Sequence, residues 1–336
     1  VRDRGMRRIA VVSTSRADYS QLNWVLAELQ AQAEVDLRNN AIGALLSEEF
    51  GRAVEEIERD GFEISERVEC LHSSDNDVGM AKTIGTATLG LTEVLARLRP
   101  DLLLLNADRY ELMAPASVAL ALRIPMAHIE GGEVSQGAID DAVRNALTKL
   151  SHLHFTPTES ARRRVLAMGE EPWRVHRVGA PSLDHLRKQP LFDRPRLAAD
   201  LGVTVEESAV VVAYHPVTLA RNTLGEVDEL FAALEGLERQ IVFCFPNADA
   251  GSRELIRRAT DFCRARTHAE LFVNLHPVTY WSLLRNASLM LGNSSSGIME
   301  TASLELPTVN VGMRQQGRER AANVVDTVAD RDAILD

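Results

Sequence analysis

The sequence has few cysteines, no long apolar run and fewer basic than acidic residues. The three cysteines, Cys70, Cys244 and Cys263, are widely spaced and odd in number. This pattern fits neither a disulfide framework nor a CxxC metal site, and it indicates a reducing compartment. No apolar stretch approaches the roughly 20 residues of a membrane-spanning helix, and no signal-peptide core follows the basic start. We therefore expect a soluble cytoplasmic protein with no membrane partner.

The charge balance argues against a polyanionic partner. Lys and Arg total 37 against 48 Asp and Glu, which gives a formal net charge of −11 at pH 7. Such a balance disfavours binding to a nucleic-acid backbone, so we expect no nucleic acid, although a local cluster of donors could still hold a small anion. With 45% hydrophobic and 25% charged residues, the 336-residue chain has the composition of a globular protein of one large or two medium domains.

Short apolar runs alternate with longer amphipathic stretches along the chain. Continuous apolar runs of this length are typical of strands buried on both faces of a parallel sheet. The expected strands cover 9–12, 102–105, 124–129, 210–213, 241–245, 271–275, 289–291 and 308–311, and the main expected helices cover 21–32, 52–60, 83–98, 142–150 and 249–266. This βαβ rhythm predicts an α/β protein built from Rossmann-like, doubly wound domains.

The strand and helix series starts again after a charged, proline-bearing segment, 186–197. We interpret this segment as a linker and predict an N-terminal domain over 1–186 and a C-terminal domain over 187–336. Two consecutive α/β domains would place the carboxyl ends of two parallel sheets opposite each other. A cleft between the domains is therefore the expected ligand site.

The sequence has neither a GxGxxG after the first strand nor a GxxxxGK[ST], which argues against a dinucleotide site and a P-loop. Instead, the run 292–300, GNSSSGIME, leaves an apolar strand and enters an expected helix. Its small residues, Ser294 to Gly297, could present N–H groups and hydroxyls to a phosphate, or form an ordinary N-cap and turn. Glu300 could bind a ribose hydroxyl, or be an exposed glutamate in the first turn of the helix.

Two basic groups follow other expected strands. Arg16 could bind the same anion through its planar guanidinium, or form a surface ion pair. His215 could donate to a diphosphate leaving group or carry a proton, or have a structural role. His152 and His154 lack a third ligand at zinc spacing, so we expect them to be packing or supporting residues and expect no metal.

Three carboxylates form the most informative group. Asp108 and Glu130 each follow a buried apolar strand, and Asp140 lies at the start of the next helix. Acids that converge on one cleft can be held in different protonation states by mutual repulsion and burial. Each also has a structural interpretation: pairing of Asp108 with Arg109 or Arg144, a turn at Glu130, and a helix N-cap at Asp140 or Asp141. Their joint placement at strand ends favours the functional interpretation.

Several long strings occur in an ordered series along the chain. They are STSRADYSQL (13–22), GMAKTIG (79–85), HIEGGEVSQGAIDDAVRNALTKLSHLHF (128–155), YHPVTL (214–219), FPNADAGSRE (245–254) and GNSSSGIMETASLELPTVNVGMRQQGR (292–318). Together they resemble the hydrolysing UDP-N-acetylglucosamine 2-epimerases of the sialic-acid pathway. The resemblance implies two Rossmann-like domains in the glycosyltransferase-B arrangement, a UDP-sugar in the cleft, a homodimer, and neither a metal nor a nicotinamide cofactor.

The resemblance also implies a reaction and a set of site residues. UDP would be eliminated from UDP-GlcNAc to give 2-acetamidoglucal, and water would then add with inversion at C2 to release N-acetylmannosamine. By motif position, the catalytic residues would be Asp108, Glu130, Asp140 and His215, and the UDP-sugar-binding residues would be Arg16, Asn247, Asp249, Ser294, Ser295, Ser296, Gly297 and Glu300. Of the acids, we expect Asp108 and Asp140 to handle protons at C2 and Glu130 to assist at C3 or the incoming water.

Two departures from the family pattern leave the sugar open. Relatives often have Arg-His where this chain has Arg144-Asn145, and a glycine where it has Ala107. The same chemistry on a UDP-2,4-diacetamido-2,4,6-trideoxyhexose, a non-hydrolysing epimerase, and a glycosyltransferase of the same fold are the alternatives.

Overall fold

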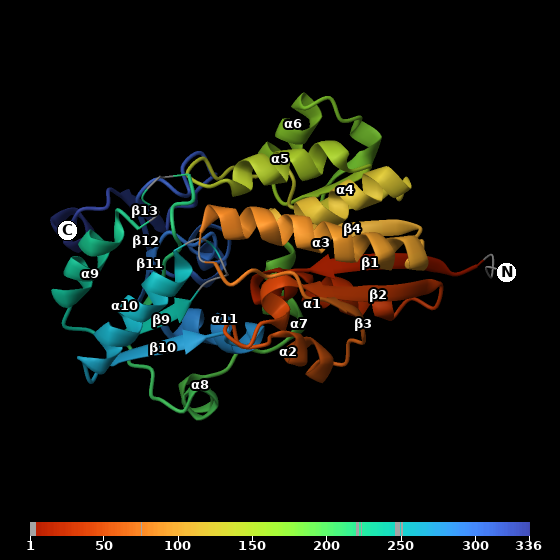
Figure 1. Cartoon of the computed structure of the whole chain (residues 1–336). Helices are drawn as coiled ribbons and strands as arrows, with labels where there is room; N and C mark the ends of the chain where they lie inside the picture. The colour runs from red at the N-terminus through yellow and green to blue at the C-terminus, as the bar shows by residue number, and fades with distance from the viewer. Residues whose placement is uncertain (1–4, 75, 220–221, 223, 246–248, 250) are drawn as a thin grey trace. The chain divides into compact units, whose positions relative to one another are not determined.

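The computed structural model describes residues 5–74, 76–219, 222, 224–245, 249 and 251–336 (Figure 1). Its contacts divide the chain into two compact units. The first comprises Val1–Glu133 and Ile139–Ser182, and the second comprises Val134–Ala138 and Leu183–Asp336. The short segment Val134–Ala138 thus packs with the second unit, although the chain on both sides of it belongs to the first.

The first unit is built around a seven-stranded sheet with all neighbouring strands parallel, in the order β3-β2-β1-β4-β5-β6-β7. Its strands are β1 (Arg7–Ser13), β2 (Val35–Ile42), β3 (Ile64–Val68), β4 (Leu102–Asn106), β5 (Met126–Ile129), β6 (Leu153–Thr156) and β7 (Val175–Arg177). Its α-helices are α1 (Arg16–Gln30), α2 (Val54–Arg59), α3 (Asp77–Leu98), α4 (Met113–Leu122), α5 (Asp140–Leu150) and α6 (Glu159–Ala167). Helices α3, α4 and α5 pack side by side in sequence order (Figure 1).

The second unit contains a six-stranded parallel sheet in the order β10-β9-β8-β11-β12-β13. Its strands are β8 (Val210–Ala213), β9 (Ile241–Phe245), β10 (Ala269–Val273), β11 (Leu289–Gly292), β12 (Thr308–Val311) and β13 (Val324–Thr327). Its α-helices are α7 (His185–Lys188), α8 (Arg194–Leu201), α9 (Val227–Glu235), α10 (Ser252–Arg264), α11 (Pro277–Asn286), α12 (Ser296–Met299) and α13 (Arg331–Leu335). The segment 186–197, expected to be a linker, is thus partly helical.

Each sheet carries apolar side chains on both faces. In β1, Ala10 and Val12 belong to one hydrophobic cluster and Val11 to another, and in β8 Val211 is separated from its two neighbours in the same way. Because successive side chains of a strand point to opposite faces, both faces must be covered by helices. The prediction of two Rossmann-like, doubly wound units is confirmed.

The strand order of each sheet shows where a ligand can bind. In the first sheet the chain reverses its direction of winding between β1 and β4, and in the second between β8 and β11. Open parallel sheets of this kind bind ligands outside the carboxyl ends of the strands at such a reversal. The candidate residues Arg16, Asp108 and Glu130 follow β1, β4 and β5, and His215 follows β8, so they lie at this edge of their own sheet.

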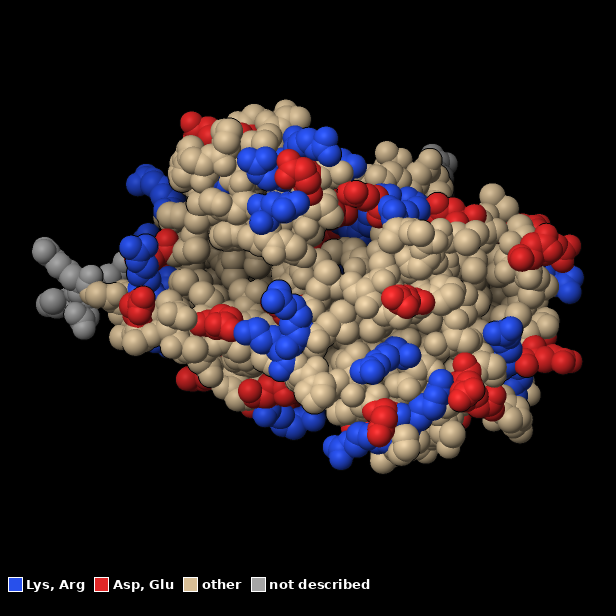
Figure 2. Space-filling view, turned by 180° about the vertical axis from the view of Figure 1, so that it is seen from behind, with Lys and Arg blue, Asp and Glu red and all other residues tan. Residues whose placement is uncertain are grey.

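Charged side chains of both signs are interspersed on the surface. On the face seen in Figure 2, Lys and Arg alternate with Asp and Glu rather than forming a basic stripe. Within the described part of the chain, no helix combines the length and apolarity required to cross a bilayer.

Candidate functional site

Two of the predicted acids leave neighbouring strands of the first sheet at the same level. Asn106 at the end of β4 is in register with Ile129 at the end of β5, so Asp108 and Glu130 emerge close to each other. The backbone is strained at both acids. Ala107, the residue before Asp108, has a φ of 60°, and Glu130 itself has a φ of 63°. Left-handed conformations are rare for residues other than glycine and cluster at functional sites.

Backbone hydrogen bonds hold both of these sharp turns. The Ala107 N–H donates to the Ile129 carbonyl at 3.1 Å, and the Glu130 N–H donates to the Phe155 carbonyl at 2.9 Å. Glu130 itself is buried. The three strand ends β4, β5 and β6 are therefore connected to one another, and the direction of both acids is determined by the sheet.

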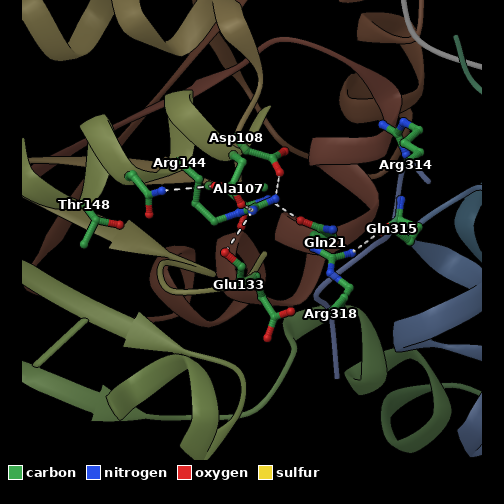
Figure 3. Close-up of polar contacts among 12 residues, drawn as sticks. Gln21, Ala107, Asp108, Glu133, Arg144, Thr148, Arg314, Gln315 and Arg318 are labelled. Atoms are coloured by element: carbon green, nitrogen blue, oxygen red, sulfur yellow. Dashed lines mark hydrogen bonds and ion pairs between the residues drawn. The ribbon is translucent and has the colours of Figure 1, made fainter. Parts of the chain in front are cut away.

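Arg144 on α5 holds the first acid (Figure 3). Its guanidinium is buried, with 1% exposure of the side chain, and forms an ion pair with the Asp108 carboxylate. The same guanidinium donates to the Glu133 carbonyl at 3.0 Å, and Nη1 lies 3.7 Å from Asp141 Oδ1. A buried guanidinium is stable only when its charge and its donors are matched, so Arg144 connects α5 firmly to the turn after β4.

These contacts decide between the structural alternatives for the acids. Asp108 pairs with Arg144, whereas Arg109 pairs with the buried Glu111 at 3.0 Å. Asp140 is the first residue of α5 and is not its N-cap, which is Ile139. The N-cap alternative for Asp140 or Asp141 is therefore wrong, and both carboxylates lie on the first turn of the helix that supplies Arg144.

The turn before Arg16 is fixed by a buried aspartate. Asp18 Oδ2 accepts from the Thr14 N–H at 2.9 Å and the Ser15 N–H at 3.2 Å, and also from the Thr14 hydroxyl. Burial raises the pKa of Asp18, and the Thr14 hydrogen bonds and the nearby Arg109 charge oppose this rise. Ser15 and Asp18 form a capping box at the start of α1, so Arg16 begins this helix from a rigid turn.

In the second unit, Asn293 joins the ends of β8 and β11. Its side-chain oxygen accepts from the His215 N–H at 2.7 Å, and its amide donates to the His215 carbonyl at 2.9 Å. Gly292 before it has φ 142°, and a Cβ there would lie 2.1 Å from the Ala213 carbonyl oxygen. Only glycine allows this close approach, which places His215 next to the serine run.

The serine run forms a chain of hydroxyl contacts. The Tyr280 hydroxyl donates to Ser296 Oγ at 2.8 Å, and Ser296 Oγ donates in turn to Glu300 Oε2. Glu300 is buried, so the alternative of an exposed first-turn glutamate is wrong. Helix α12 is a single turn of four residues, so its dipole is small. An anion at this position would be held mainly by the N–H and hydroxyl groups of the serine run.

Several residues of the second site were missed by the sequence interpretation. Arg314 Nη1 and Gln315 Nε2 both donate to the Asn293 carbonyl, at 3.1 and 2.9 Å, and Arg318 Nη1 donates to Gln315 Oε1 at 3.3 Å (Figure 3). Gln315 and Arg318 are buried. The available signal was their position after β12, in a polar run that directly follows an apolar strand. In the first unit, Arg144 was considered only as a structural partner of Asp108.

The remaining predicted residues are placed as follows. Asp249 is buried, and its N–H donates to Ser252 Oγ at 3.2 Å at the start of α10. Asn247 lies outside the described residues. Ser294 Oγ accepts from the Ser296 N–H at 3.3 Å. Gly297 has no room for a side chain, since a Cβ would lie 2.9 Å from Thr308 Cγ2. Within the residues that the structure describes, no group of three or more His, Cys, Asp or Glu side chains is arranged to hold a metal ion.

The two edges are suited to different chemistry. The first unit presents Asp108, Glu130 and Asp140 on a rigid frame that includes the buried Arg144, an arrangement that can move protons. The second presents amides, hydroxyls and guanidinium groups around Asn293, an arrangement that can hold a phosphate ester.

Known proteins of similar sequence and structure agree with this description. A family model described as UDP-N-acetylglucosamine 2-epimerase matches residues 27–336. The GDP/UDP-N,N'-diacetylbacillosamine 2-epimerase (hydrolyzing) of Campylobacter jejuni is 35% identical over 324 residues, which cover 96% of this chain and 84% of the relative. The UDP-N,N'-diacetylbacillosamine 2-epimerase (hydrolyzing) of Legionella pneumophila is 37% identical over 334 residues, 98% of this chain and 87% of the relative.

A solved structure provides the same result for the fold. The UDP-GlcNAc 2-epimerase of Neisseria meningitidis, bound to UDP-GlcNAc, matches with a TM-score of 0.80 at 17% identity, covering 98% of this chain and 89% of that one. The family model and the two relatives extend over nearly the same length of sequence. The chain belongs to the UDP-N-acetylglucosamine 2-epimerase family.

Proposed function

We propose that the protein is a hydrolysing 2-epimerase that acts on a UDP-activated 2-acetamido sugar. The observation that carries this proposal is the Asp108 carboxylate, paired with the buried Arg144 at the end of β4 and adjacent to Glu130 at the end of β5. A guanidinium partner favours the ionised carboxylate, which is the form that a base needs. The family membership and the hydrolysing relatives support the same reaction type.

The proposed reaction has two balanced steps. A carboxylate takes the C2 proton, the C2–H electron pair forms the C1=C2 double bond, and the C1–O bond breaks so that UDP leaves with its electron pair. Water then adds its hydroxyl to C1 of the glucal, and a proton is delivered to C2 on the opposite face. The net reaction consumes one water and releases UDP and the free 2-epimeric sugar.

The residues of each unit have separate proposed roles. Asp108 and Asp140 exchange protons with C2, and Glu130 assists at C3 or at the water. In the second unit, His215 and the serine run (Ser294 to Gly297) bind the diphosphate, whose growing negative charge must be stabilised as it leaves.

Further contacts to the nucleotide are proposed from the positions of these residues in the motifs that resemble the family. Arg16 binds the diphosphate, Glu300 binds the ribose, and Asn247 and Asp249 contact the nucleotide.

We propose a 2,4-diacetamido-2,4,6-trideoxyhexose as the preferred sugar. The Campylobacter and Legionella relatives, at 35% and 37% identity, are named for diacetylbacillosamine. In the same sequence comparison, the UDP-N-acetylglucosamine 2-epimerase of Neisseria meningitidis is 28% identical over 333 residues. UDP-GlcNAc is the second candidate, and the Campylobacter name also makes the GDP-sugar worth testing.

We further propose a cytoplasmic homodimer. Leu89 on α3 and Leu120 on α4 are 76% and 56% exposed, and these two helices pack against each other, so they could bury apolar surface against a second copy. Light scattering of the wild type and of Leu89→Lys tests this: a dimer that becomes a monomer supports it, and a wild-type monomer contradicts it.

The function is tested by following the products over time. Purified protein is incubated with UDP-diacetamido-trideoxyhexose, its GDP counterpart or UDP-GlcNAc, and ³¹P and ¹H NMR spectra are recorded. Release of UDP or GDP in step with a free 2-epimeric sugar is the expected result. An epimeric UDP-sugar would indicate the non-hydrolysing reaction, and turnover that requires an added sugar acceptor would indicate a glycosyltransferase. Either of these results contradicts the proposal.

A further inference from the structure

One buried histidine contacts two of the elements that carry the acids. His128 on β5 has no exposed surface. Its Nε2 lies 2.7 Å from the Ala107 carbonyl oxygen, and its Nδ1 lies 3.1 Å from Thr148 Oγ1 on α5. One side of the ring thus contacts the turn before Asp108, and the other side contacts the helix that begins with Asp140. Glu130 lies two residues farther along the same chain segment.

The contacts define the protonation state of the ring. A carbonyl oxygen can only accept, so Nε2 must carry the proton and donate to Ala107. Burial lowers the pKa of His128 to about 4, and the hydrogen bond to the Ala107 carbonyl opposes this effect. The ring is therefore neutral at physiological pH, and Nδ1 accepts a hydrogen bond from the Thr148 hydroxyl.

Thr148 occupies an informative position on α5. Asp140, Arg144 and Thr148 are spaced by four residues, so they lie along one side of the helix. Arg144 and Thr148 are both buried. A hydrogen bond to Thr148 therefore fixes the rotation of α5 about its axis, which sets the directions of Asp140 and Arg144.

The space around this contact is closely filled. A Cβ at Gly131 would lie 2.9 Å from Thr148 Oγ1 and 3.1 Å from His128 Nδ1. Because these two contacts are shorter than normal van der Waals distances for carbon, position 131 has no room for a side chain while α5 stays at its present distance. The glycine after Glu130 is thus part of the same arrangement.

We propose that His128 is a positioning residue that holds the turn before Asp108 and helix α5 in the one arrangement in which the acids act on C2. This inference rests on the proposed epimerase function and adds to it a residue that does not touch the substrate. It requires no contact with the nucleotide. Loss of either hydrogen bond should reduce the rate of the chemical step and leave binding of UDP unchanged.

The variants separate the two hydrogen bonds. In His128→Gln, the amide nitrogen can replace Nε2 and donate to Ala107, whereas His128→Asn places its amide near Nδ1 and loses that contact. Thr148→Ser keeps the hydroxyl, and Thr148→Val removes it with little change in volume. His154→Gln is the matched control, because His154 is also fully buried and lies opposite His128 in the register of β5 and β6, but contacts Glu170 instead.

The expected results follow from the cost of misplacing a catalytic group. A displacement of about 1 Å can reduce a rate roughly 100-fold, so we expect kcat of His128→Asn to fall by about that factor, with KM and the Kd for UDP within about threefold of wild type. His128→Gln and Thr148→Val should show smaller losses, and Thr148→Ser should recover most of the rate. His154→Gln should keep its kcat. Equal kcat losses in His128→Asn and His154→Gln, or a loss confined to KM, would overturn the proposal.

A second measurement needs no turnover. Hydrogen–deuterium exchange of the peptides that cover 105–111 and 140–150 should be faster in His128→Asn and Thr148→Val than in wild type and in His154→Gln. If the wild type releases no nucleoside diphosphate from any of the three nucleotide sugars, the proposed function fails while exchange still reports on the positioning role. Unchanged exchange in both variants would overturn that role even in an active enzyme.

Discussion

The two units carry nearly the same kind of sheet and present different groups at its carboxyl edge. In the first unit, the edge holds carboxylates around the buried Arg144, and the strand ends turn at the strained residues Ala107 and Glu130. In the second, the edge holds Gly292, Asn293 and a serine run. One fold thus supplies a rigid frame for side-chain acids in one unit and an anion-binding surface of amides and hydroxyls in the other. The difference lies in the residues that follow the strands.

The sharpest way to separate the two edges is to remove one acid. Asp108→Asn keeps the size of the side chain and removes the base. Because general base catalysis contributes roughly 10²–10⁴-fold, we expect kcat to fall by about 10³-fold or more, with the Kd for UDP unchanged. Steady-state kinetics and calorimetry measure the two effects. The control is Asp101→Asn, an exposed residue just before the opposite end of β4; if it lost as much activity, the loss in Asp108→Asn would not be specific to the site.

In the second unit, the largest loss of stability is expected from a substitution at Gly292, where the backbone passes close to the Ala213 carbonyl. Gly292→Ala would place a Cβ 2.1 Å from the Ala213 carbonyl oxygen at φ 142°, so we expect the free energy of unfolding to fall by about 3–4 kcal/mol. Urea denaturation measures this. Gly202→Ala is the matched control, because Gly202 has φ 74° and a Cβ at this position would meet no other atom within 4 Å, and it should cost only about 1 kcal/mol. Equal losses in the two variants would contradict the account of Gly292.

The sequence predicted those strands whose own residues carry the signal, and it missed strands that depend on contacts with distant parts of the chain. β4 and β8 were predicted because continuous apolar runs are required by two covered faces. β2 was missed because half of it is polar, and the contacts that satisfy those groups, such as Asn40 Nδ2 donating to the Val11 carbonyl at 3.0 Å, come from another strand. β3 (ISERV) and β13 (VVDT) were missed because they lie at sheet edges and charged residues interrupt their apolar runs.

The residues of the candidate site likewise divide into those that the local sequence predicted and those that it did not. Asp108 and Glu130 could be selected because they follow predicted strands closely, and Glu300 because it lies in the motif run 292–300 that leaves one. The pairing of Asp108 with Arg144 was one of two alternatives that the sequence left open, and the sequence could not choose between them because the two residues lie 36 positions apart. The contact of Gln315 with Asn293, 22 positions away, was not predicted at all. Periodicity carries no information about such pairs.

The buried His128 of the first unit should make the free energy of unfolding depend on pH. Burial lowers the pKa of His128 from 6.5 to about 4. Between these values the unfolded chain binds a proton that the folded state does not, so the free energy of unfolding falls as the pH falls from about 6.5 to 4. We expect His128 alone to contribute a loss of about 2 kcal/mol between pH 7 and pH 5. Urea unfolding at both pH values should show this part of the loss in wild type and not in His128→Gln; identical pH slopes would contradict it.

The smallest expected effect is in the hydroxyl chain of the second unit. Ser296→Ala breaks the contacts from Tyr280 and to Glu300. In the proposed complex, Ser296 also donates to the charged diphosphate. Because a hydrogen bond to a charged group is worth about 1.5–3 kcal/mol, we expect the Kd for UDP to rise about tenfold and kcat at saturation to change little. Calorimetry compares it with Ser303→Ala, an exposed serine on the following turn. A large loss of kcat with unchanged UDP affinity would reverse the division of roles between the units.

The most direct test of that division is deuterium incorporation at C2. Wild type, Asp108→Asn and Ser296→Ala are each incubated with the UDP-2-acetamido sugar in deuterated water, and the free product is examined by ¹H NMR. The account predicts full deuterium at C2 in wild type, the same labelling at saturating substrate in Ser296→Ala, and no detectable labelled product from Asp108→Asn in the time that the wild type needs to convert its substrate. A free 2-epimeric sugar that keeps its original hydrogen at C2, or labelled product formed by Asp108→Asn as fast as by the wild type, would contradict it.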